Sequence, residues 1–150
     1  MQHCCICSVV SIMVEAILNK HDLKNTGCRK FILSELLKSD TALSESEIKE
    51  PFPDLFDRVT FYRTLKTLEE KNVIHKIILN DNSVKYALTR HQHDNEQLHS
   101  HFHCEKCDDV LCLHGKTRFE ADLPKNFVKK EVFVIIEGVC NKCFSPVLKG

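Results

Sequence analysis

The feature that most constrains this chain is a repeated Cys-x-x-Cys pair, Cys104 with Cys107 and Cys140 with Cys143. Two such pairs can bring four thiolates to one tetrahedral ion, and closed sites of this kind hold structural zinc. The intervening residues exceed the usual zinc-ribbon gap, so a strand, a helix and a second strand must fit between the pairs. The alternatives are a redox dithiol or buried unpaired thiols, but a redox motif needs only one pair and a βαβ context that is missing. The spacing therefore predicts a structural Zn²⁺ site.

Histidines gather just before the first cysteine pair. Six of the nine histidines lie between positions 91 and 114. On a strand, His99, His101 and His103 would point to the same face, because successive side chains alternate. Imidazole with a carboxylate or a thiolate suits Zn, Fe, Ni or Mn, and an exchangeable site is usually poorer in thiolate than a structural one. The alternative is a solvated polar hinge, but beside a metal site we interpret His99 and His101 as ligands of a second metal.

Paired cysteines are more often metal ligands than disulfides in a reducing compartment such as the cytosol. The apolar stretch from Cys4 to Leu18 has no Lys or Arg before it, contains Glu15 and shows no small-residue cleavage pattern, so we do not expect a signal peptide. The stretch is also shorter than the roughly 20 apolar residues that a membrane span needs. We therefore expect a cytoplasmic protein without a membrane partner. Cys5, Cys7 and Cys4 remain open between buried packing, a reactive cluster and a metal patch.

The charge balance limits how the chain can meet nucleic acid. There are 21 basic and 21 acidic residues, and 43% of the chain is hydrophobic, which is typical of a soluble globular protein. Zero formal charge excludes an arm that binds polyanions by bulk charge. Any contact with nucleic acid must use a local patch.

Apolar periodicity predicts four helices in the first 88 residues. We expect one from about Cys7 to Asn19, one after Thr26, a short one after Ser44 and one from Asp57 to about Lys71. Thr26 and Asp57 are the expected N-caps, Ser44 with Glu47 makes a capping-box arrangement, and Asn72 tolerates the left-handed turn that ends the last helix. The second helix is expected to carry Phe31, Ile32, Leu36 and Leu37 on one face. Two β-rich runs follow, residues 73–79 and 83–88, separated by a polar hairpin turn. This order of helices and hairpin is typical of a winged helix-turn-helix domain.

The last of these helices would read DNA. Its buried stripe is Phe61, Leu65 and Leu68, at spacings of four and three residues. The polar residues that lie away from this stripe can contact phosphates or base edges. They are Thr60, Tyr62, Arg63, Thr64 and Thr67.

The remainder of the chain predicts a second small domain. Residues 89–98 are polar and unpatterned, so we interpret them as a hinge between a domain of residues 1–88 and a domain of residues 99–150. The second domain is expected to hold short strands at 101–104 and 110–113, a helix near 116–121 and a strand at 132–136. The predicted fold class is α+β.

Four segments together resemble the ferric uptake regulator (Fur) superfamily of metal-responsive repressors. Leu23–Arg29 is similar to its Thr-x-x-Arg start of the second helix, and Val59–Leu65 to its Thr-Val-Tyr-Arg-Thr-Leu reading helix. His99–Cys107 resembles its His-x-His-x-x-Cys-x-x-Cys box, and Gly138–Cys143 its closing Gly-x-Cys-x-x-Cys. The four segments occur in the family's order and cover most of the chain.

The resemblance implies a homodimer that reads an inverted-repeat operator in double-stranded DNA and represses transcription to control metal homeostasis. It implies that the C-terminal domain is an α/β dimerisation and metal-sensing domain, and that the four paired cysteines hold structural zinc. DNA contacts would come from Arg29 and the reading helix, chiefly Tyr62 and Arg63. His99 and His101 would belong to a regulatory site for a second divalent metal, Zn²⁺ or Fe²⁺.

Departures from the family pattern concentrate in this sensor. Where iron regulators usually carry a His and two Glu residues, this chain has Ala42, Ala87 and Cys112. Some family members have a further metal site, but at its positions this chain carries residues that are apolar or hydroxyl-bearing, namely Leu98, Ser100 and Val132. By the resemblance, the usual iron-binding set is therefore incomplete.

The replacements favour zinc. His75 occupies a position that is a metal ligand in zinc uptake regulators, and Cys112 adds a thiolate, which favours zinc over iron. Extra residues before the histidine box supply His91, His93 and Glu96 as further candidates. We interpret the chain as a zinc sensor, with iron sensing and peroxide sensing through bound iron as alternatives within the family.

Two functions from other classes are alternatives. A zinc enzyme would use His99, His101 and Cys112 as an open site with Glu96 or Glu105 as base, but the short chain shows no cleft-forming α/β core. A zinc-stabilised interaction module would bind DNA, if at all, without a response to metal. We therefore do not expect an enzyme.

Overall fold

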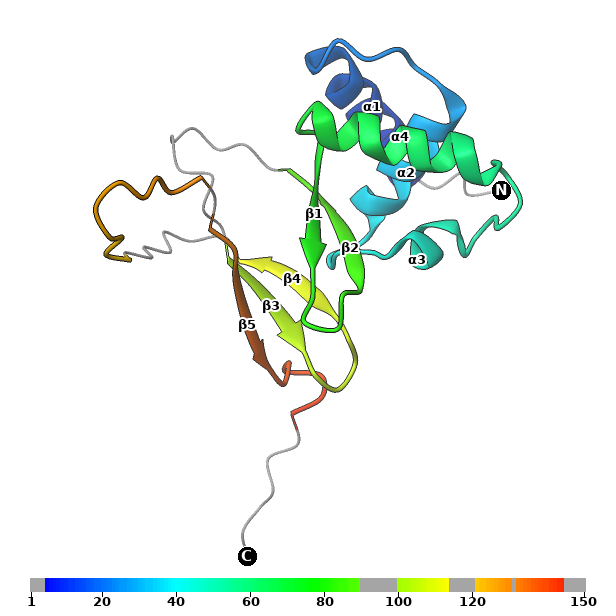
Figure 1. Cartoon of the computed structure of the whole chain (residues 1–150). Helices are drawn as coiled ribbons and strands as arrows, with labels where there is room; N and C mark the ends of the chain where they lie inside the picture. Colours follow the sequence, from blue (N-terminus) through cyan, green and yellow to red (C-terminus); the bar gives the residue numbers. More distant parts are fainter. Residues whose placement is uncertain (1–4, 90–99, 114–120, 131, 145–150) are drawn as a thin grey trace, which may run out of the picture. The chain divides into compact units, whose positions relative to one another are not determined.

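The chain divides into two compact units, residues 1–91 and 92–150, which are described separately. The structure, a computed structural model, describes residues 5–89, 100–113, 121–130 and 132–144 (Figure 1). None of the helices in these described ranges is both long enough and apolar enough to cross a membrane.

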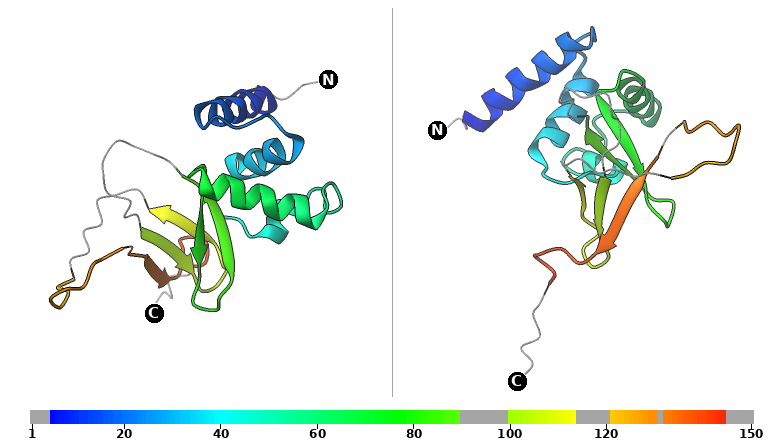
Figure 2. Two further views of the ribbon diagram at one scale, coloured as in Figure 1. Left: turned by 45° about the horizontal axis from the view of Figure 1, so that its top comes forward. Right: turned by 90° about the vertical axis from the view of Figure 1, so that its left-hand side faces the viewer.

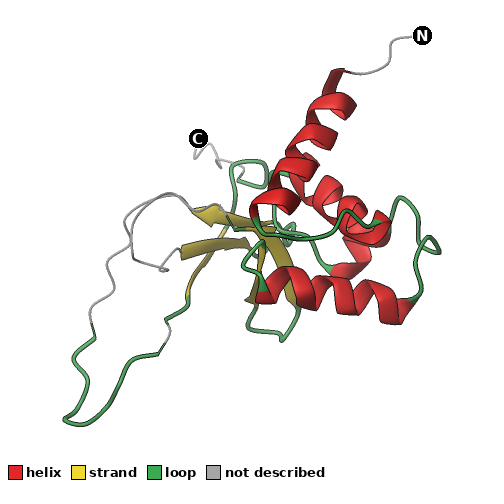
Figure 3. Cartoon of the chain, turned by 90° about the horizontal axis from the view of Figure 1, so that it is seen from above, coloured by secondary structure: helices red, strands yellow, loops and turns green. Residues whose placement is uncertain are grey.

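The first unit is built from helices and a hairpin. Its elements, labelled in Figure 1, are α1 (Cys5–Lys20), α2 (Gly27–Lys38), α3 (Glu45–Lys49), α4 (Arg58–Glu70), β1 (Ile74–Ile78) and β2 (Val84–Leu88). The helices, red in Figure 3, pack around one apolar cluster. The predicted stripe Phe61, Leu65 and Leu68 is buried in it, with each side chain at most 2% exposed. This confirms the helical order expected from periodicity.

The apolar face of α2 is rotated from the expected one. Phe31 and Leu37 are only partly buried, whereas Cys28 and Leu33 join Ile32 in the core. The reason is that α2 packs against both α1 and α4, so its buried surface is wider than a single stripe.

Side-chain caps fix the helix boundaries around α3 and α4. Ser44 and Glu47 form a reciprocal capping box at α3, and Asp57 accepts a hydrogen bond from the Thr60 backbone at 2.9 Å. Asn72 has φ 53°, the left-handed turn expected just past α4. Thr26 does precede α2, but its side chain makes no capping hydrogen bond, contrary to its predicted role.

The hairpin forms the expected wing. Strands β1 and β2 pair antiparallel, with His75 opposite Ala87. Tyr86 also exchanges two backbone hydrogen bonds with Leu43, which ties the segment before α3 to the wing. The wing is therefore held to the helices by backbone pairing as well as by apolar contacts.

The second unit contains a three-stranded sheet, visible in Figure 2. Strand β3 (Ser100–Cys104) lies between β4 (Val110–Leu113), which is antiparallel to it, and β5 (Val134–Gly138), which is parallel. β5 begins and ends two residues later than predicted, because its ladder with β3 begins at Val134. The helix expected near 116–121 falls mostly outside the described residues, and Ala121, the one described residue of that range, is not helical. The predicted domain boundaries and hinge also involve residues outside the description.

A buried cation connects the wing to α3. Lys85 is only 5% exposed, and its Nζ lies 3.3 Å from both carboxylate oxygens of Glu47. Burial alone would raise the pKa of Glu47, but hydrogen bonds with Ser44 and the charge of Lys85 outweigh it and hold this pKa below its usual value. The Glu47 carboxylate is therefore ionised at neutral pH.

Replacing Glu47 by Gln should destabilise the first unit in a pH-dependent way. The lowered pKa means that the carboxylate stabilises the fold above the usual value of 4.5, and this contribution is lost as the pH falls through the folded-state pKa. We expect a loss of about 0.5–1 kcal/mol near neutral pH. Urea unfolding followed by tyrosine fluorescence reports on this unit, because both tyrosines, Tyr62 and Tyr86, belong to it. Glu50→Gln, at the other end of α3, is the control, and equal effects of Glu47→Gln at acid and neutral pH would contradict the ion-pair account.

Candidate metal centres and nucleic-acid interface

Helix α4 presents a polar face opposite its buried stripe. Thr60, Tyr62 and Arg63 are exposed, with Tyr62 60% exposed. The Thr64 hydroxyl donates to the Thr60 carbonyl at 2.8 Å, so its proton is held by the helix and its oxygen remains an acceptor. Capping by Asp57 fixes the first turn, where a reading helix meets base edges.

Arg29 lies on the same surface as α4. A groove of about 440 Å³ runs between the start of α2 and α4, and both Arg29 and Arg63 line it together with four threonines. The Arg29 guanidinium donates to the Lys24 carbonyl at 2.9 Å. The structure thus brings Arg29, Thr60, Arg63 and Thr64 to one groove. Sequence reasoning missed Cys28, which also lines it and is buried; burial raises the pKa of its thiol.

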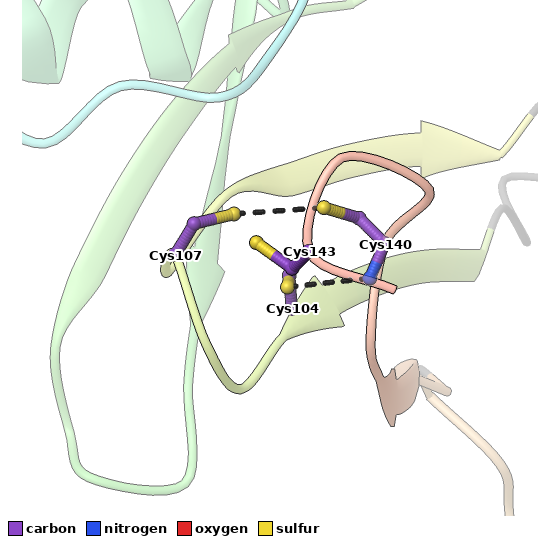
Figure 4. Close-up of side chains that lie close together, drawn as sticks. All are labelled: Cys104, Cys107, Cys140 and Cys143. Atoms are coloured by element: carbon purple, nitrogen blue, oxygen red, sulfur yellow. Dashed lines mark hydrogen bonds between the residues drawn. The ribbon is translucent and has the colours of Figure 1, made fainter. Parts of the chain in front are cut away.

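The four paired cysteines converge, as predicted. Cys104 ends β3 and Cys107 lies in the following turn, while Cys140 and Cys143 lie in the loop after β5 (Figure 4). Their four sulfurs lie within 4.8 Å of one another, and Cys107 Sγ is 3.7 Å from Cys140 Sγ. Because β3 and β5 run parallel, both Cys-x-x-Cys turns emerge at the same end of the sheet.

The sulfurs sit in an environment that accepts one negative charge readily and resists more. The backbone N–H of Cys140 donates to Cys104 Sγ at 3.3 Å and, with the N–H of Cys107, lowers the pKa of Cys104 to about 6. A backbone hydrogen bond from Asp109 favours the Cys107 thiolate, but burial and the neighbouring sulfurs outweigh it and raise its pKa to about 12. Four thiolates can therefore coexist here only around a cation, and tetrahedral sulfur ligation suits zinc.

A second pair of metal-binding side chains lies on the same sheet. His101 on β3 and Cys112 on β4 are opposite each other in the antiparallel register, and an imidazole nitrogen and the thiol sulfur lie within 4.8 Å. His101 is buried. An imidazole and a thiolate form half of a tetrahedral zinc site.

Of the other candidate ligands of the regulatory metal, the structure describes only His75. His75 lies on β1 in the first unit, with its Nδ1 3.4 Å from the Thr89 hydroxyl. His99, His93 and Glu96 lie outside the described residues, so their predicted roles stay predictions.

His103 has partners that the sequence did not indicate. Its Nε2 lies 2.8 Å from the Asp108 carboxylate, and its Nδ1 lies 3.6 Å from that of Glu137. Glu137 faces it because the parallel pairing of β3 and β5 places these two residues opposite each other. Pairing between strands so far apart in the chain leaves no local signal in the sequence.

Comparison with known proteins identifies this arrangement. A winged-helix unit combined with a cysteine-bearing sheet defines the class as winged-helix regulators, and the model of the ferric uptake regulator family matches residues 20–136. The chain belongs to the ferric uptake regulator family. The ferric uptake regulation protein of Campylobacter jejuni subsp. jejuni serotype O:2 is 34% identical over 136 residues, covering 85% of this chain and 83% of the relative.

Solved structures share the fold. A zinc uptake regulator in complex with zinc and DNA has a TM-score of 0.65 at 19% identity, covering 93% of this chain and 95% of that one. The Helicobacter pylori ferric uptake regulator, described with three functional metal binding sites, has a TM-score of 0.55 at 20% identity, covering 91% and 92%. The predicted α+β fold is thereby confirmed.

Removing one thiolate should release the metal and unfold the sheet of the second unit. We expect Cys140→Ser to lose one zinc per chain, because a structural zinc site supplies folding energy directly. Zinc content by mass spectrometry and amide exchange in β3, β4 and β5 measure both effects. Cys112→Ser is the matched control and should retain this zinc and its protected amides. Protected amides and full zinc content in Cys140→Ser would refute a structural role.

Proposed function

We propose that this chain is a zinc-responsive transcriptional repressor that binds an inverted-repeat DNA operator as a homodimer in the cytoplasm. The observation that carries the choice of zinc is the His101–Cys112 pair, because a thiolate beside an imidazole favours zinc over iron. Membership of the family supports metal-dependent DNA binding as its general function.

We assign DNA reading to α4. Its exposed residues Tyr62 and Arg63 can enter a major groove, while Arg29 and the hydroxyls lining the groove beside α4 are suited to phosphates. The zinc uptake regulator of similar fold was solved with DNA bound, which supports this assignment. The operator would be read by two copies of α4, one from each protomer.

The metals have separate roles in this proposal. The four paired cysteines hold a structural Zn²⁺, and the regulatory Zn²⁺ binds His101 and Cys112. His99 and His75 are proposed as further regulatory ligands, followed by His93 and Glu96; their support comes from the sequence alone. Ligands drawn from different parts of the chain would let the metal select the arrangement of reading helices that fits the operator.

Exposed apolar side chains in the second unit support dimerisation there. They include Phe127 at 67%, Val128 at 85% and Phe133 at 67% exposure, with Ile136 and Phe144 also exposed. Several large apolar side chains exposed on one small unit favour an interaction surface there. We propose that a second copy of the chain covers them.

Arg63→Ala should weaken operator binding about tenfold or more, because it removes a phosphate or guanine contact without touching the core. A palindromic duplex selected from a random library by the zinc-loaded wild type serves as probe, and fluorescence anisotropy measures affinity. Lys38→Ala, which removes a like charge from the end of α2, should change affinity little. Equal affinities of Arg63→Ala and the wild type would argue against α4 as the reading helix.

His101→Ala and Cys112→Ala should each abolish the metal response. In the wild type we expect zinc to raise affinity for the same duplex about 5–150-fold, the usual range of allosteric coupling. Both variants should keep the structural zinc and bind DNA equally with and without added metal. His21→Ala is the control. A stronger response to Fe²⁺ than to Zn²⁺ under anaerobic conditions would show that the sensed metal is iron.

A further inference from the structure

His103 lies between two carboxylates beside the cysteine cluster but is not part of it. It occupies β3 next to Cys104, and its register neighbour on β5 is Glu137. The turn that follows Cys107 supplies Asp108. None of the roles assigned above uses these three side chains.

Asp108 holds the imidazole through its Nε2. Its backbone has φ 62°, a left-handed conformation that favours glycine and that Asp and Asn tolerate better than most residues. Its N–H donates to the Cys104 carbonyl at 2.9 Å, and its carboxylate lies 2.8 Å from Nε2. In this pairing Nε2 carries the proton, so a carboxylate fixes the ring orientation and its tautomer.

The other ring nitrogen then faces an acceptor. Nδ1 of His103 is buried and has no hydrogen-bond partner among the described residues. The Glu137 Oε1 lies 3.6 Å from this Nδ1, which is too long for a hydrogen bond. With a proton on Nε2 alone, two lone-pair-bearing atoms face each other across this gap, so the arrangement calls for a positive charge there, supplied either by a second ring proton on Nδ1 or by a metal ion.

The gap has the size of one edge of a zinc coordination shell. Zn–N and Zn–O bonds of about 2.0–2.2 Å at a tetrahedral angle place two ligand atoms roughly 3.3–3.5 Å apart. A histidine bonded to metal through one nitrogen commonly donates its other N–H to a carboxylate, which is the role that Asp108 fills. Although Nδ1 itself is buried, the Glu137 side chain is 37% exposed, so water can reach the carboxylate side of the gap.

We propose that His103 Nδ1 and Glu137 form an additional, weak Zn²⁺ site, with water completing the coordination and Asp108 as positioning residue. The site is separate from the four cysteines and from the His101–Cys112 pair. Two protein ligands and open water positions make its ion exchangeable. The rival is an imidazolium held between two carboxylates without metal.

¹⁵N NMR spectra of the imidazole nitrogens distinguish the zinc site from the metal-free imidazolium. We would label histidines with ¹⁵N in the full chain carrying its structural zinc and add ZnCl₂ at neutral pH. The site predicts that His103 Nδ1 moves to a metal-bound shift while Nε2 keeps its proton. An imidazolium with both nitrogens protonated and no response to ZnCl₂ would overturn the proposal.

Matched variants test the ligands by zinc titration. Glu137→Gln keeps the shape of the side chain and should weaken the additional site at least tenfold, and Asp108→Ala should weaken it about 10–100-fold. Glu105→Gln removes an exposed carboxylate from the neighbouring turn and should leave the titration unchanged. Unchanged binding in Glu137→Gln, or an equal loss in Glu105→Gln, would show that zinc responds to general negative charge instead.

Discussion

The convergence of four sulfurs on one point is the constraint on which the second unit depends. Its described apolar interior is small, with only Cys104, Val110 and Cys140 counted as buried hydrophobic residues. A sheet of three strands with so little apolar core needs another source of stability. The sulfurs supply it when a cation neutralises them, because parallel strands β3 and β5 then have their ends joined by metal–ligand bonds.

The first unit is stabilised by different physics. Its helices bury a continuous apolar cluster that includes Leu18, Ile32 and Phe61, each fully buried. Caps and one partly buried ion pair set the position of α3 and the wing against this cluster. The outer face of α4 contributes little to this packing, so the exposed Tyr62 and Arg63 are available for the DNA contacts proposed above. Metal loss should accordingly affect the two units unequally.

The sequence predicted those features that depend on interactions between residues close together in the chain. Helix periods, the capping box at Ser44 and the turn at Asn72 follow from neighbouring residues, and the Cys-x-x-Cys spacing anticipated the four-sulfur cluster. Pairing between distant strands carried no such signal. The shift of β5, and the meeting of His103 with Glu137, depend on a parallel register that only the folded chain reveals. Burial of Lys85 was missed for the same reason, since its partner Glu47 lies in another element.

Strand β3 links these sites physically. It pairs with β4 through His101 and Cys112, with β5 through His103 and Glu137, and ends in Cys104. Once the thiolates hold a metal, β3 is already ordered, so a second ion at His101 does not have to fold the strand that presents its ligand. The binding free energy of that ion is then available to favour one conformation of the chain over another. In the proposed function, a structural metal beside the His101–Cys112 pair would separate folding from signalling, and the Cys112 thiolate would favour zinc at that pair as well.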